Sequence, residues 1–420
     1  MEQEHKDAIL NILRIKINRQ LLYYLDLCAR CAICRDACHQ YKITGDITYL
    51  PAYRAELLRR IYKKNISAFG RIFPGLYEGR EADDENLLDE LYRAAYACTG
   101  CRRCMVYCPF SIDTTWMLSV AKELLNAAGR GNAILGELAD AAIMKGESMD
   151  IFRDILIETL KEAEEELKLK IKDSNASIPV EKEGAEILYV ALTGTHTILP
   201  AAMIFNKAGK NWTLSLYEAA NYGYFLGDSK KAKAVADRIV SGAKKLKVEE
   251  VIITECGHAY RVMNFLYEAW AKEKLPFKIR GIVEVIARYI KDGLIRVNEK
   301  CISEPVTYHD PCQVGRNAGF FDEPRYIINR IASDFRDLNP NRERNWCCGG
   351  GGGLVAMPEF EEFRIKTGKL KMEQINRTQA KILVTPCENC RLQIGSLNDT
   401  FKLNLNINSI MDFVADNMII

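Results

Sequence analysis

The sequence lacks the charge surplus that is typical of a nucleic-acid-binding protein. Lysine and arginine together number 58, and aspartate and glutamate together number 56. A protein that binds DNA or RNA needs a basic excess on one face to neutralise phosphates. The near-balance of charge therefore predicts that nucleic acid is not a partner.

The sequence also lacks an uninterrupted apolar run of transmembrane length. The nearest candidate, residues 187–205, has no Asp, Glu, Lys or Arg but includes three threonines, a glycine, a histidine and a proline in its middle part. We interpret it as a strand, a loop and the start of a helix. A soluble protein is therefore expected, which leaves docking on a membrane partner open.

A signal peptide is missing from the first residues, and the chain is much longer than the disulfide-rich domains of secreted proteins. Fifteen cysteines are nevertheless present, an odd number, and most fall into three tight groups. We therefore expect a reducing cytoplasm in which the thiolates ligate metal–sulfur centres. The length of 420 residues predicts two or three domains, each with its own core.

Two of the cysteine groups have the spacing of the bacterial two-cluster ferredoxin run, in which the fourth cysteine ligates the other cluster. The runs are Cys28-x-x-Cys31-x-x-Cys34-x-x-x-Cys38 and Cys98-x-x-Cys101-x-x-Cys104-x-x-x-Cys108. The spacing predicts two cubane 4Fe–4S clusters. The expected ligands of the first are Cys28, Cys31, Cys34 and Cys108, and those of the second are Cys98, Cys101, Cys104 and Cys38.

Three residues inside or beside these runs allow more than one interpretation. His39 stands where proline usually follows the fourth cysteine, a minor departure because proline shapes the turn but does not ligate. Arg102 and Arg103 lie within the second run. They either raise the potential of that cluster, contact an acidic partner, or are solvated surface side chains, and the last interpretation is the one we favour.

Helical patterns surround the runs. The spacer between the runs, residues 40–97, is too long for a compact bacterial ferredoxin, which favours an α-helical ferredoxin domain. Residues 172–177 are the best linker candidate. The first helix packs on its own domain or, alternatively, docks on a partner. The expected helices are residues 5–27, 51–64, 84–97, 114–128 and about 150–172.

After Glu186, short β-rich runs alternate with helices, which predicts parallel α/β units. Residues 251–258 mirror residues 382–389, so we expect a duplicated domain with its join near residues 299–305. The expected strands are residues 187–192, 213–217, 251–254, 306–308 and 382–385.

The predicted fold class is α + α/β. It consists of an N-terminal α-helical ferredoxin domain with two cubane clusters and two tandem Rossmann-like α/β half-domains, the first of them degenerate. The expected ranges are 1–135 for the two-cluster ferredoxin domain, 136–180 for a helical linker, 181–300 for the degenerate half-domain and 301–420 for the complete one.

The third cysteine group lies in the second half-domain. Cys312 ends Tyr308-His309-Asp310-Pro311-Cys312, the pair Cys347-Cys348 precedes five glycines, and Cys387 and Cys390 form a Cys-x-x-Cys. Adjacent cysteines on a regular strand point to opposite faces, so both reach one centre only where the backbone bends, which glycine permits. A zinc knuckle with stray cysteines is the alternative, but zinc needs four ligands and five are present.

This arrangement resembles the CCG, or cysteine-rich, domain of heterodisulfide reductases. In that family five such cysteines hold a non-cubane 4Fe–4S cluster at which a disulfide is cleaved. With the ferredoxin runs included, the resemblance covers nearly the whole chain after the first helix. It is strongest to the HdrD-type family of heterodisulfide reductase subunits, with its DsrK-type and TmcB-type members. The ligands implied for the non-cubane cluster are Cys312, Cys347, Cys348, Cys387 and Cys390.

The first half-domain lacks most of these ligands. No cysteine is present in Glu218–Gly223, where a Cys-Cys-Gly is expected, and His196 lies roughly where the leading cysteine would stand. Only Cys256 remains. We therefore predict a single non-cubane cluster, held by the second half-domain. The isolated Cys301 receives no role.

The segment Glu255-Cys256-Gly257-His258 is expected to approach the non-cubane cluster from the opposite side if the halves pack about a pseudo-twofold axis. Reductive disulfide cleavage needs protons for the departing thiolates, and histidine titrates near neutrality. His258 and His309 are therefore candidate proton donors, Cys256 is a candidate partner for substrate sulfur, and Glu255 completes the candidate catalytic set. Alternatively, His258 caps a helix, Cys256 packs in the core and a strand end holds His309.

The resemblance implies an electron path. A membrane quinol or cytochrome b-type subunit (DsrM/HdrE type) would reduce the two cubanes, which would feed the non-cubane cluster. The substrate would be a small thiol-coenzyme heterodisulfide or the trisulfide of a DsrC-like protein. The protein would be cytoplasmic and peripheral on the membrane through its partner. The alternative is an electron-transfer subunit of a flavoprotein 2-hydroxyacid or glycerol-3-phosphate dehydrogenase, with no sulfur chemistry.

Overall fold

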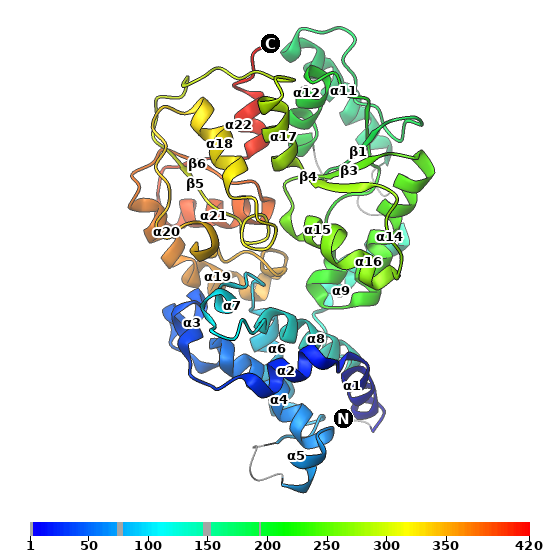
Figure 1. Ribbon diagram of the computed structural model, residues 1–420, viewed down its shortest axis with the longest axis vertical. Coiled ribbons are helices and arrows are strands. Elements are labelled where there is room, and N and C mark those ends of the chain that lie inside the picture. Colours follow the sequence, from blue (N-terminus) through cyan, green and yellow to red (C-terminus); the bar gives the residue numbers. More distant parts are fainter. Residues whose placement is uncertain (1–2, 74–78, 146–152, 193–194) are drawn as a thin grey trace. The chain divides into compact units, whose positions relative to one another are not determined.

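The computed structural model describes residues 3–73, 79–145, 153–192 and 195–420 (Figure 1). The chain forms two compact units, each built from several stretches of sequence. The helical unit comprises Met1–Glu137, Gly223–Ser229 and Trp346–Lys371. The α/β unit comprises Leu138–Tyr222, Lys230–Asn345 and Met372–Ile420. The four domain ranges expected from the sequence stay a prediction.

The helical unit consists of short helices joined by the two cysteine runs. Helices α9 (Ala133–Lys145), α13 (Tyr222–Leu226), α14 (Ser229–Leu246) and α20 (Lys369–Asn376) span the boundaries between the stretches. The remaining helices of this unit are α1 (Gln3–Lys16), α2 (Arg19–Leu27), α3 (His39–Thr44), α4 (Pro51–Asn65), α5 (Ala68–Ile72), α6 (Glu85–Tyr96), α7 (Arg103–Tyr107), α8 (Thr114–Ala127) and α19 (Glu361–Thr367).

Side-chain caps set several of these helix starts. The predicted helix over residues 5–27 is two helices, because the Asn18 side chain accepts a hydrogen bond from Leu21 N and begins α2 there. Asp84 and Asp113 cap α6 and α8 in the same way. Helix α8 packs against α1, α4 and α6 and forms the centre of the unit. The apolar spacing of the sequence thus located the helices but not the break at Asn18.

The α/β unit contains two parallel sheets. The first half comprises β1 (Ile187–Val190), β2 (Trp212–Leu214), β3 (Glu250–Ile253) and β4 (Lys278–Gly281), and the second comprises β5 (Val306–Tyr308), β6 (Ile382–Val384) and β7 (Asn406–Asn408). The helices are α11 (Arg153–Ile171), α12 (Leu199–Lys207), α14 (Ser229–Leu246), α15 (Gly257–Arg261), α16 (Tyr267–Ala271), α17 (Ile282–Lys291), α18 (Asp322–Ile331), α21 (Glu388–Phe401) and α22 (Ile410–Ala415).

The strand order is the same in both halves. The first sheet has the order β2-β1-β3-β4, with Ile187 paired to Glu250 in parallel register. The second has the order β5-β6-β7, with Val306 paired to Ile382, and a parallel bridge from Val306 to Phe335 occupies the place that β2 takes in the first. The predicted α + α/β class is confirmed, and the repeated topology agrees with a duplication.

The two halves pack reciprocally around one hydrophobic core. Helix α12, which follows the first strand of its half, contacts α22, which follows the last strand of the other half. Helices α18 and α17 make the equivalent contact with the halves exchanged. This exchange is the contact pattern of a pseudo-twofold relation. In this arrangement the carboxyl ends of β3 and β6, which precede Cys256 and Cys387, occupy equivalent positions in the two halves.

Within the described parts of the chain, no helix combines the length and the apolar character needed to cross a bilayer. The segment 187–205, the most apolar candidate of the sequence, contains β1, a short 3₁₀ turn and the first part of α12. It therefore contributes to the core of the α/β unit.

Candidate iron–sulfur sites

Four thiols from both cysteine runs gather in the helical unit at one cavity, which Cys104 also lines. These four are Cys28, Cys31, Cys34 and Cys108. Burial raises the pKa of Cys34 to about 11, and the nearby charges of Cys28, Cys108 and Cys31 act in the same direction. A metal centre would displace the thiol protons and remove this repulsion. The structure thus brings together the set that the spacing predicts for the first cubane.

A second cavity in the helical unit is lined by Cys38, Cys98, Cys101 and Cys104. Burial raises the pKa of Cys104 well above its ordinary value, and the other three cysteines raise it further. His39 lines the same cavity and is buried. Burial, with the positive charges of Arg54, Arg103 and Lys371, lowers the pKa of His39 to about 3, so its imidazole is neutral.

The two runs share a backbone geometry that turns their thiols inward. The second residue after the first cysteine has a positive φ in both runs, Arg30 at 56° and Gly100 at 67°. The second residue before the third cysteine repeats this, with Ala32 and Arg102 both at 59°. The left-handed conformation is unfavourable for residues other than glycine. Its recurrence at matching positions shows that both loops are shaped around a common kind of centre.

Arg103 is not a solvated surface side chain, and the sequence-based interpretation was wrong on this point. It is 2% exposed, and its guanidinium donates to the backbone carbonyls of Asp36 and Ala37. The Arg103 guanidinium carbon also lies 3.4 Å from the ring centroid of Trp346. Because Trp346 precedes Cys347, this stacking holds the start of the glycine-rich loop in contact with the second cysteine run, to which Arg103 belongs.

The Cys347-Cys348 pair and its glycines belong to the helical unit. The Cys347 thiol lies 3.4 Å from the Thr99 hydroxyl, inside the second run. The amides of Gly349 and Gly350 donate to the sulfurs of Cys347 and Cys348 at 3.4 Å. Donation by backbone amides favours the thiolate form.

Gly352 shows why this loop needs glycine. Its φ is +70°, and a Cβ atom there would lie 2.4 Å from the carbonyl oxygen of Cys98. A larger residue would therefore separate the loop from the second cysteine run.

The other three cysteines of the group lie in the α/β unit. Cys312 follows β5, Cys387 is the N-cap residue of α21, and Cys390 lies in the first turn of that helix. The Cys390 side chain and the backbone amides of Cys390 and Gly257 lower the pKa of Cys387 against the effect of burial. The N-terminus of a helix also favours thiolates.

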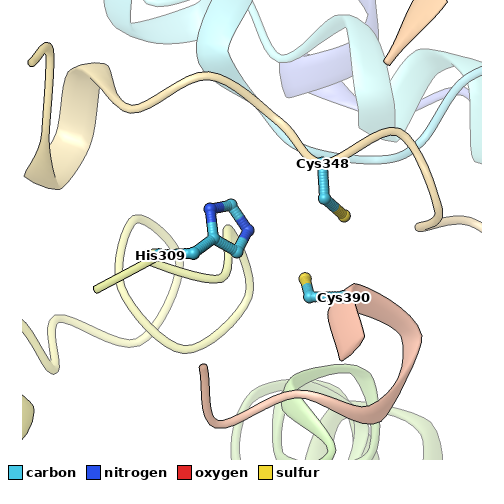
Figure 2. Close-up of side chains that lie close together, drawn as sticks. All are labelled: His309, Cys348 and Cys390. Atoms are coloured by element: carbon cyan, nitrogen blue, oxygen red, sulfur yellow. The ribbon is translucent and has the colours of Figure 1, made fainter. Parts of the chain in front are cut away.

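His309 and Cys390 present ligand atoms within 4.8 Å of each other. Figure 2 shows the His309 ring and the Cys390 sulfur facing the same space, and it also draws Cys348, which belongs to the helical unit. The Asn345 amide nitrogen donates to the Asp310 carbonyl at 3.0 Å, which sets its orientation, and lies 3.2 Å from His309 Nδ1. The Nδ1 atom therefore accepts, and Nε2 carries the proton of the neutral ring.

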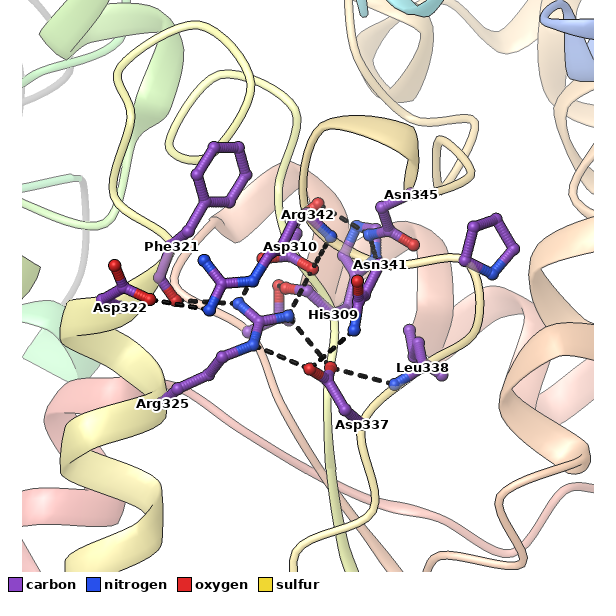
Figure 3. Close-up of polar contacts among 12 residues, drawn as sticks. His309, Asp310, Phe321, Asp322, Arg325, Asp337, Leu338, Asn341, Arg342 and Asn345 are labelled. Atoms are coloured by element: carbon purple, nitrogen blue, oxygen red, sulfur yellow. Dashed lines mark hydrogen bonds and ion pairs between the residues drawn. The ribbon is translucent and has the colours of Figure 1, made fainter.

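A buried ion-pair network holds the turn between β5 and Cys312. Figure 3 shows Arg325, from α18, between the carboxylates of Asp310 and Asp337. Its guanidinium donates to both oxygens of Asp310 at 2.8 and 2.9 Å and to both oxygens of Asp337 at the same two distances. Asp310 also accepts from the Arg342 amide at 2.9 Å. This bidentate pairing fixes the backbone on which His309 and Cys312 stand.

Cys256, the remaining cysteine of the first half, is the N-cap residue of α15 and lies against the second half. Its pKa is raised to about 12 by burial and by the charge of Cys387. The Glu388 amide donates to the Glu255 carbonyl at 3.1 Å, which ties the two strand ends together. A Cβ atom at Gly257 would lie 2.6 Å from the Gln313 Cβ, so glycine permits this close approach.

Glu255 and His258 flank this cysteine, and both are buried. The Glu255 carboxylate accepts from the Met411 amide at 3.0 Å and lies 3.5 Å from Arg391. Burial raises the pKa of Glu255 to about 7, and Arg391 opposes that shift. These contacts bind Glu255 to the start of α22, whereas His258 is the second residue of α15.

The residues present fit iron–sulfur clusters. Eight thiols from two runs meet in two groups of four, the ligand number of a cubane. The second cavity also has a buried positive charge, since Arg54 is 3% exposed and its Nε has no hydrogen-bond acceptor among the described residues. An anionic, thiolate-ligated cluster would compensate that charge. The five-cysteine group offers only sulfur donors, which also suits iron–sulfur ligation.

The comparisons with known proteins agree with these sites. Residues 24–112 match the model of a 4Fe-4S dicluster domain, and residues 306–395 match that of a cysteine-rich domain, CCG. The "Hdr-like menaquinol oxidoreductase iron-sulfur subunit 2" of Archaeoglobus fulgidus is 29% identical, across 96% of this chain and 81% of the relative. A subunit of the "Dihydromethanophenazine:CoB--CoM heterodisulfide reductase" of Methanosarcina mazei is 24% identical, across 94% of both chains.

A further relative is named for another reaction. The "EtfAB:quinone oxidoreductase" of Syntrophomonas wolfei is 23% identical, across 86% of this chain and 52% of the relative.

The fold and its cysteine sites thus define an iron–sulfur oxidoreductase with a dicluster domain and a cysteine-rich domain. Within that class, the chain contains a CCG domain and is similar along most of its length to Hdr-like and heterodisulfide reductase iron–sulfur subunits.

Sequence reasoning missed several residues that shape these sites. Asn345 and Arg325 contact Asp310 from 35 and 15 positions away, and Arg391 lies beside Glu255 from 136 positions away. No local motif marks such partners. Asp310, however, stands next to a candidate histidine and two residues before a candidate ligand, and an acidic residue there was a usable signal.

Proposed function

We propose that this protein is the iron–sulfur subunit of a heterodisulfide reductase-like complex that reduces a disulfide or a trisulfide. The observation that supports this most directly is the position of Cys256. The first half keeps this thiol against Cys387, a proposed cluster ligand, although the other cysteines of the motif are missing there. A relay protein has no need for a buried thiol beside its ligands, whereas a sulfur-reducing enzyme can use it to hold substrate sulfur.

The proposed cofactors are two cubane 4Fe–4S clusters and one non-cubane 4Fe–4S cluster, with the ligands expected from the sequence. When bound, these groups would supply one-electron transfer and, at the cysteine-rich site, the two electrons that a sulfur–sulfur bond requires. The protein's own residues then have three tasks, which are to admit the substrate, to hold one sulfur and to deliver protons.

The overall reaction breaks one sulfur–sulfur bond and consumes two electrons and two protons. A disulfide then releases two thiols, and a trisulfide releases one thiol and one persulfide. We assign Cys256 to hold one substrate sulfur. His309, with its proton on Nε2, and His258 are the proposed proton donors. Glu255 anchors the segment through Met411 and Arg391 and is a proposed proton acceptor and donor, because its pKa of about 7 allows both forms.

The proposed partners follow from the relatives. Their names include menaquinol and dihydromethanophenazine oxidoreductases, so a quinol-linked cytochrome b-type membrane subunit (DsrM/HdrE type) is the proposed electron donor. The proposed acceptor is a small heterodisulfide or the trisulfide of a DsrC-like protein. The proposed location is the cytoplasmic face of the membrane, through the partner subunit.

The test is an anaerobic iron determination with EPR spectra of the oxidised and reduced protein. Three 4Fe–4S clusters give about 12 irons per chain, and two cubanes alone give about 8. We expect about 12, with an oxidised-state signal that changes when a thiol substrate is added. A result near 8 with no such signal would contradict the proposal. Cys347→Ser must also lower disulfide reduction, and full activity with an altered cluster would contradict the catalytic assignment.

A second candidate is an electron-transfer subunit without sulfur chemistry. The relative named as an EtfAB:quinone oxidoreductase favours it, because that name describes electron transfer from a flavoprotein to quinone. Under this candidate, the protein serves a flavoprotein dehydrogenase of the 2-hydroxyacid or glycerol-3-phosphate type, or one that uses a related flavoprotein. Reduction of the iron–sulfur groups by such a flavoprotein, with no disulfide turnover, would support it.

A further inference from the structure

Two buried cations lie at the second cubane site of the helical unit. Arg54, on α4, lines the cavity and is 3% exposed. Lys122, on α8, is 8% exposed. Arg54 lines the same cavity as the ligand Cys98, and α8, which carries Lys122, packs against α6, which ends at Tyr96, two residues before Cys98.

The hydrogen bonds of both cations go to neutral groups. Arg54 Nη2 donates to the Gln40 side-chain oxygen at 2.6 Å. Lys122 Nζ donates to the Phe225 carbonyl at 2.8 Å and lies 4.6 Å from the centroid of the Tyr96 ring. A buried cation without an anionic partner is strongly unfavourable. These two charges therefore match an anion that occupies the cavity.

The first cubane site is different in charge. Its buried cation, Arg59, forms an ion pair with Glu56, and the same carboxylate accepts two hydrogen bonds from Arg30 at 3.0 Å. Ala55, beside Glu56, lines the first cavity. The buried positive charge on this side is thus paired with a carboxylate of the protein itself, while the second cation of the group, Arg30, is exposed to solvent.

We propose that Arg54 and Lys122 are positioning residues that hold the reduction potential of the second cubane above that of the first. One-electron reduction adds a negative charge to a cluster, and a fixed positive charge nearby stabilises the reduced form. The order of potentials would draw electrons from the Cys28-Cys31-Cys34-Cys108 site to the Cys98-Cys101-Cys104-Cys38 site.

This direction agrees with the surroundings of the two sites. The first has an exposed ligand, Cys31, and two exposed apolar neighbours, Ile33 and Phe110, where a donor can approach. The second lies against the glycine-rich loop, since the Cys347 thiol reaches Thr99 and Gly352 touches Cys98. The inference rests on the proposed function for the destination of the electrons, but the order of potentials can be tested without a substrate.

The experiment is an EPR-monitored redox titration of the holoprotein and its variants, with no disulfide present. A Cys31→Ser variant, altered at the exposed ligand of the first site, assigns each reduction wave to its cluster. In the wild type, the second cubane should be reduced at the higher potential. Lys122→Met and Arg54→Gln should each lower the equilibrium constant for electron transfer from the first cubane to the second at least tenfold. For a one-electron couple, this is a fall of about 59 mV in the reduction potential of the second cubane relative to the first.

Lys122→Arg keeps the charge and should restore the wild-type separation between the two waves. Arg30→Gln, a half-exposed position beside the first site, should leave the second wave unchanged. The proposal is overturned if the second cubane has the lower or an equal potential in the wild type. It is also overturned if both waves move together in Lys122→Met. Neither result depends on sulfur chemistry, so failure here and failure of the proposed function are distinguishable.

Discussion

The two halves of the α/β unit have the same strand order and different chemistry. Residues 187–291 retain one cysteine of the motif, and residues 306–415 carry all five, although two of these five belong to the helical unit. The scaffold, its shared core and the reciprocal helix contacts persist in both. The first half has the same strand order without these ligands, and its buried apolar residues belong to the core that both halves share.

The retained cysteine is at one of the positions where the halves meet. Cys256 and Cys387 occupy matching strand ends, β3 and β6, and each begins a helix. The positions of the Cys-Cys-Gly and of the leading cysteine in the first half are taken by Glu218–Gly223 and His196. What survived is the thiol that faces the second half.

The largest effect is expected from replacing each of these two cysteines in turn. Cys387→Ala should remove the non-cubane cluster, lower the iron content from about 12 to about 8 per chain, and abolish disulfide reduction. Cys256→Ala should keep about 12 irons and still lose most disulfide reduction. Iron determination and a disulfide-reduction assay on both variants provide the check. Equal iron loss in the two variants would make Cys256 a ligand and erase the difference between the halves.

The next effect concerns the turns that follow the first strand of each half. Arg325→Met would leave the buried Asp310 without its cation, and we expect a loss of about 3–5 kcal/mol in the free energy of unfolding. In the first half, the corresponding turn is closed by the Thr197 hydroxyl, which bonds the backbone of Leu192 at 3.2 Å. Thr197→Val should cost about 1 kcal/mol. Denaturant unfolding of the holoprotein measures both, and similar losses would contradict the contrast.

The free energy of unfolding should depend on pH through Glu255, whereas Pro386, its counterpart in the second half, cannot titrate. The folded pKa of Glu255, about 7, lies above the unfolded value, so the native state binds this proton more tightly. Stability from this group is therefore greatest below about pH 4 and falls as the pH rises to about 7.

Glu255→Gln keeps an acceptor for the Met411 amide and removes the titration. We expect the variant to gain roughly 3 kcal/mol relative to the wild type between pH 4 and pH 8. Unfolding measured across that range provides the test. A constant difference between variant and wild type would show that the carboxyl does not titrate there.

The smallest effect is expected at His196, which stands where a leading cysteine would be. Its Nε2 lies 3.5 Å from Glu388, and the side chain is 51% exposed. Burial raises the pKa of Glu388, but His196 and Arg391 outweigh it and lower that pKa to about 2. His196→Ala should change stability by less than about 1 kcal/mol and leave the iron content intact. Loss of iron would show that the first half still contributes a ligand.

The expected groups of four thiols agree with the residues that line the two cavities, and their assignment as cluster ligands stays a prediction. The regular spacing of the cysteines in each run predicts which four thiols share a cluster, so both groups could be expected from the sequence. The mirrored segments at 251–258 and 382–389 likewise predicted a repeat that the strand order bears out. Both signals are patterns among neighbouring residues, and such patterns can be recognised without a structure.

Most of the errors and omissions involve partners distant in sequence. Arg103 was assigned to the surface because nothing near it reveals Trp346, which stacks on it from 243 positions away. The break at Asn18 was missed because one capping side chain outweighs continuous apolar spacing. Asn345 and Arg325 owe their roles to contacts that only the folded chain creates.

The helical unit includes Trp346–Lys371, a stretch that the ribosome makes only after most of the chain. Until this stretch emerges, Arg103 has no indole to stack on, and Thr99 has no Cys347 beside it. The final structure of the second cubane site therefore depends on a late part of translation.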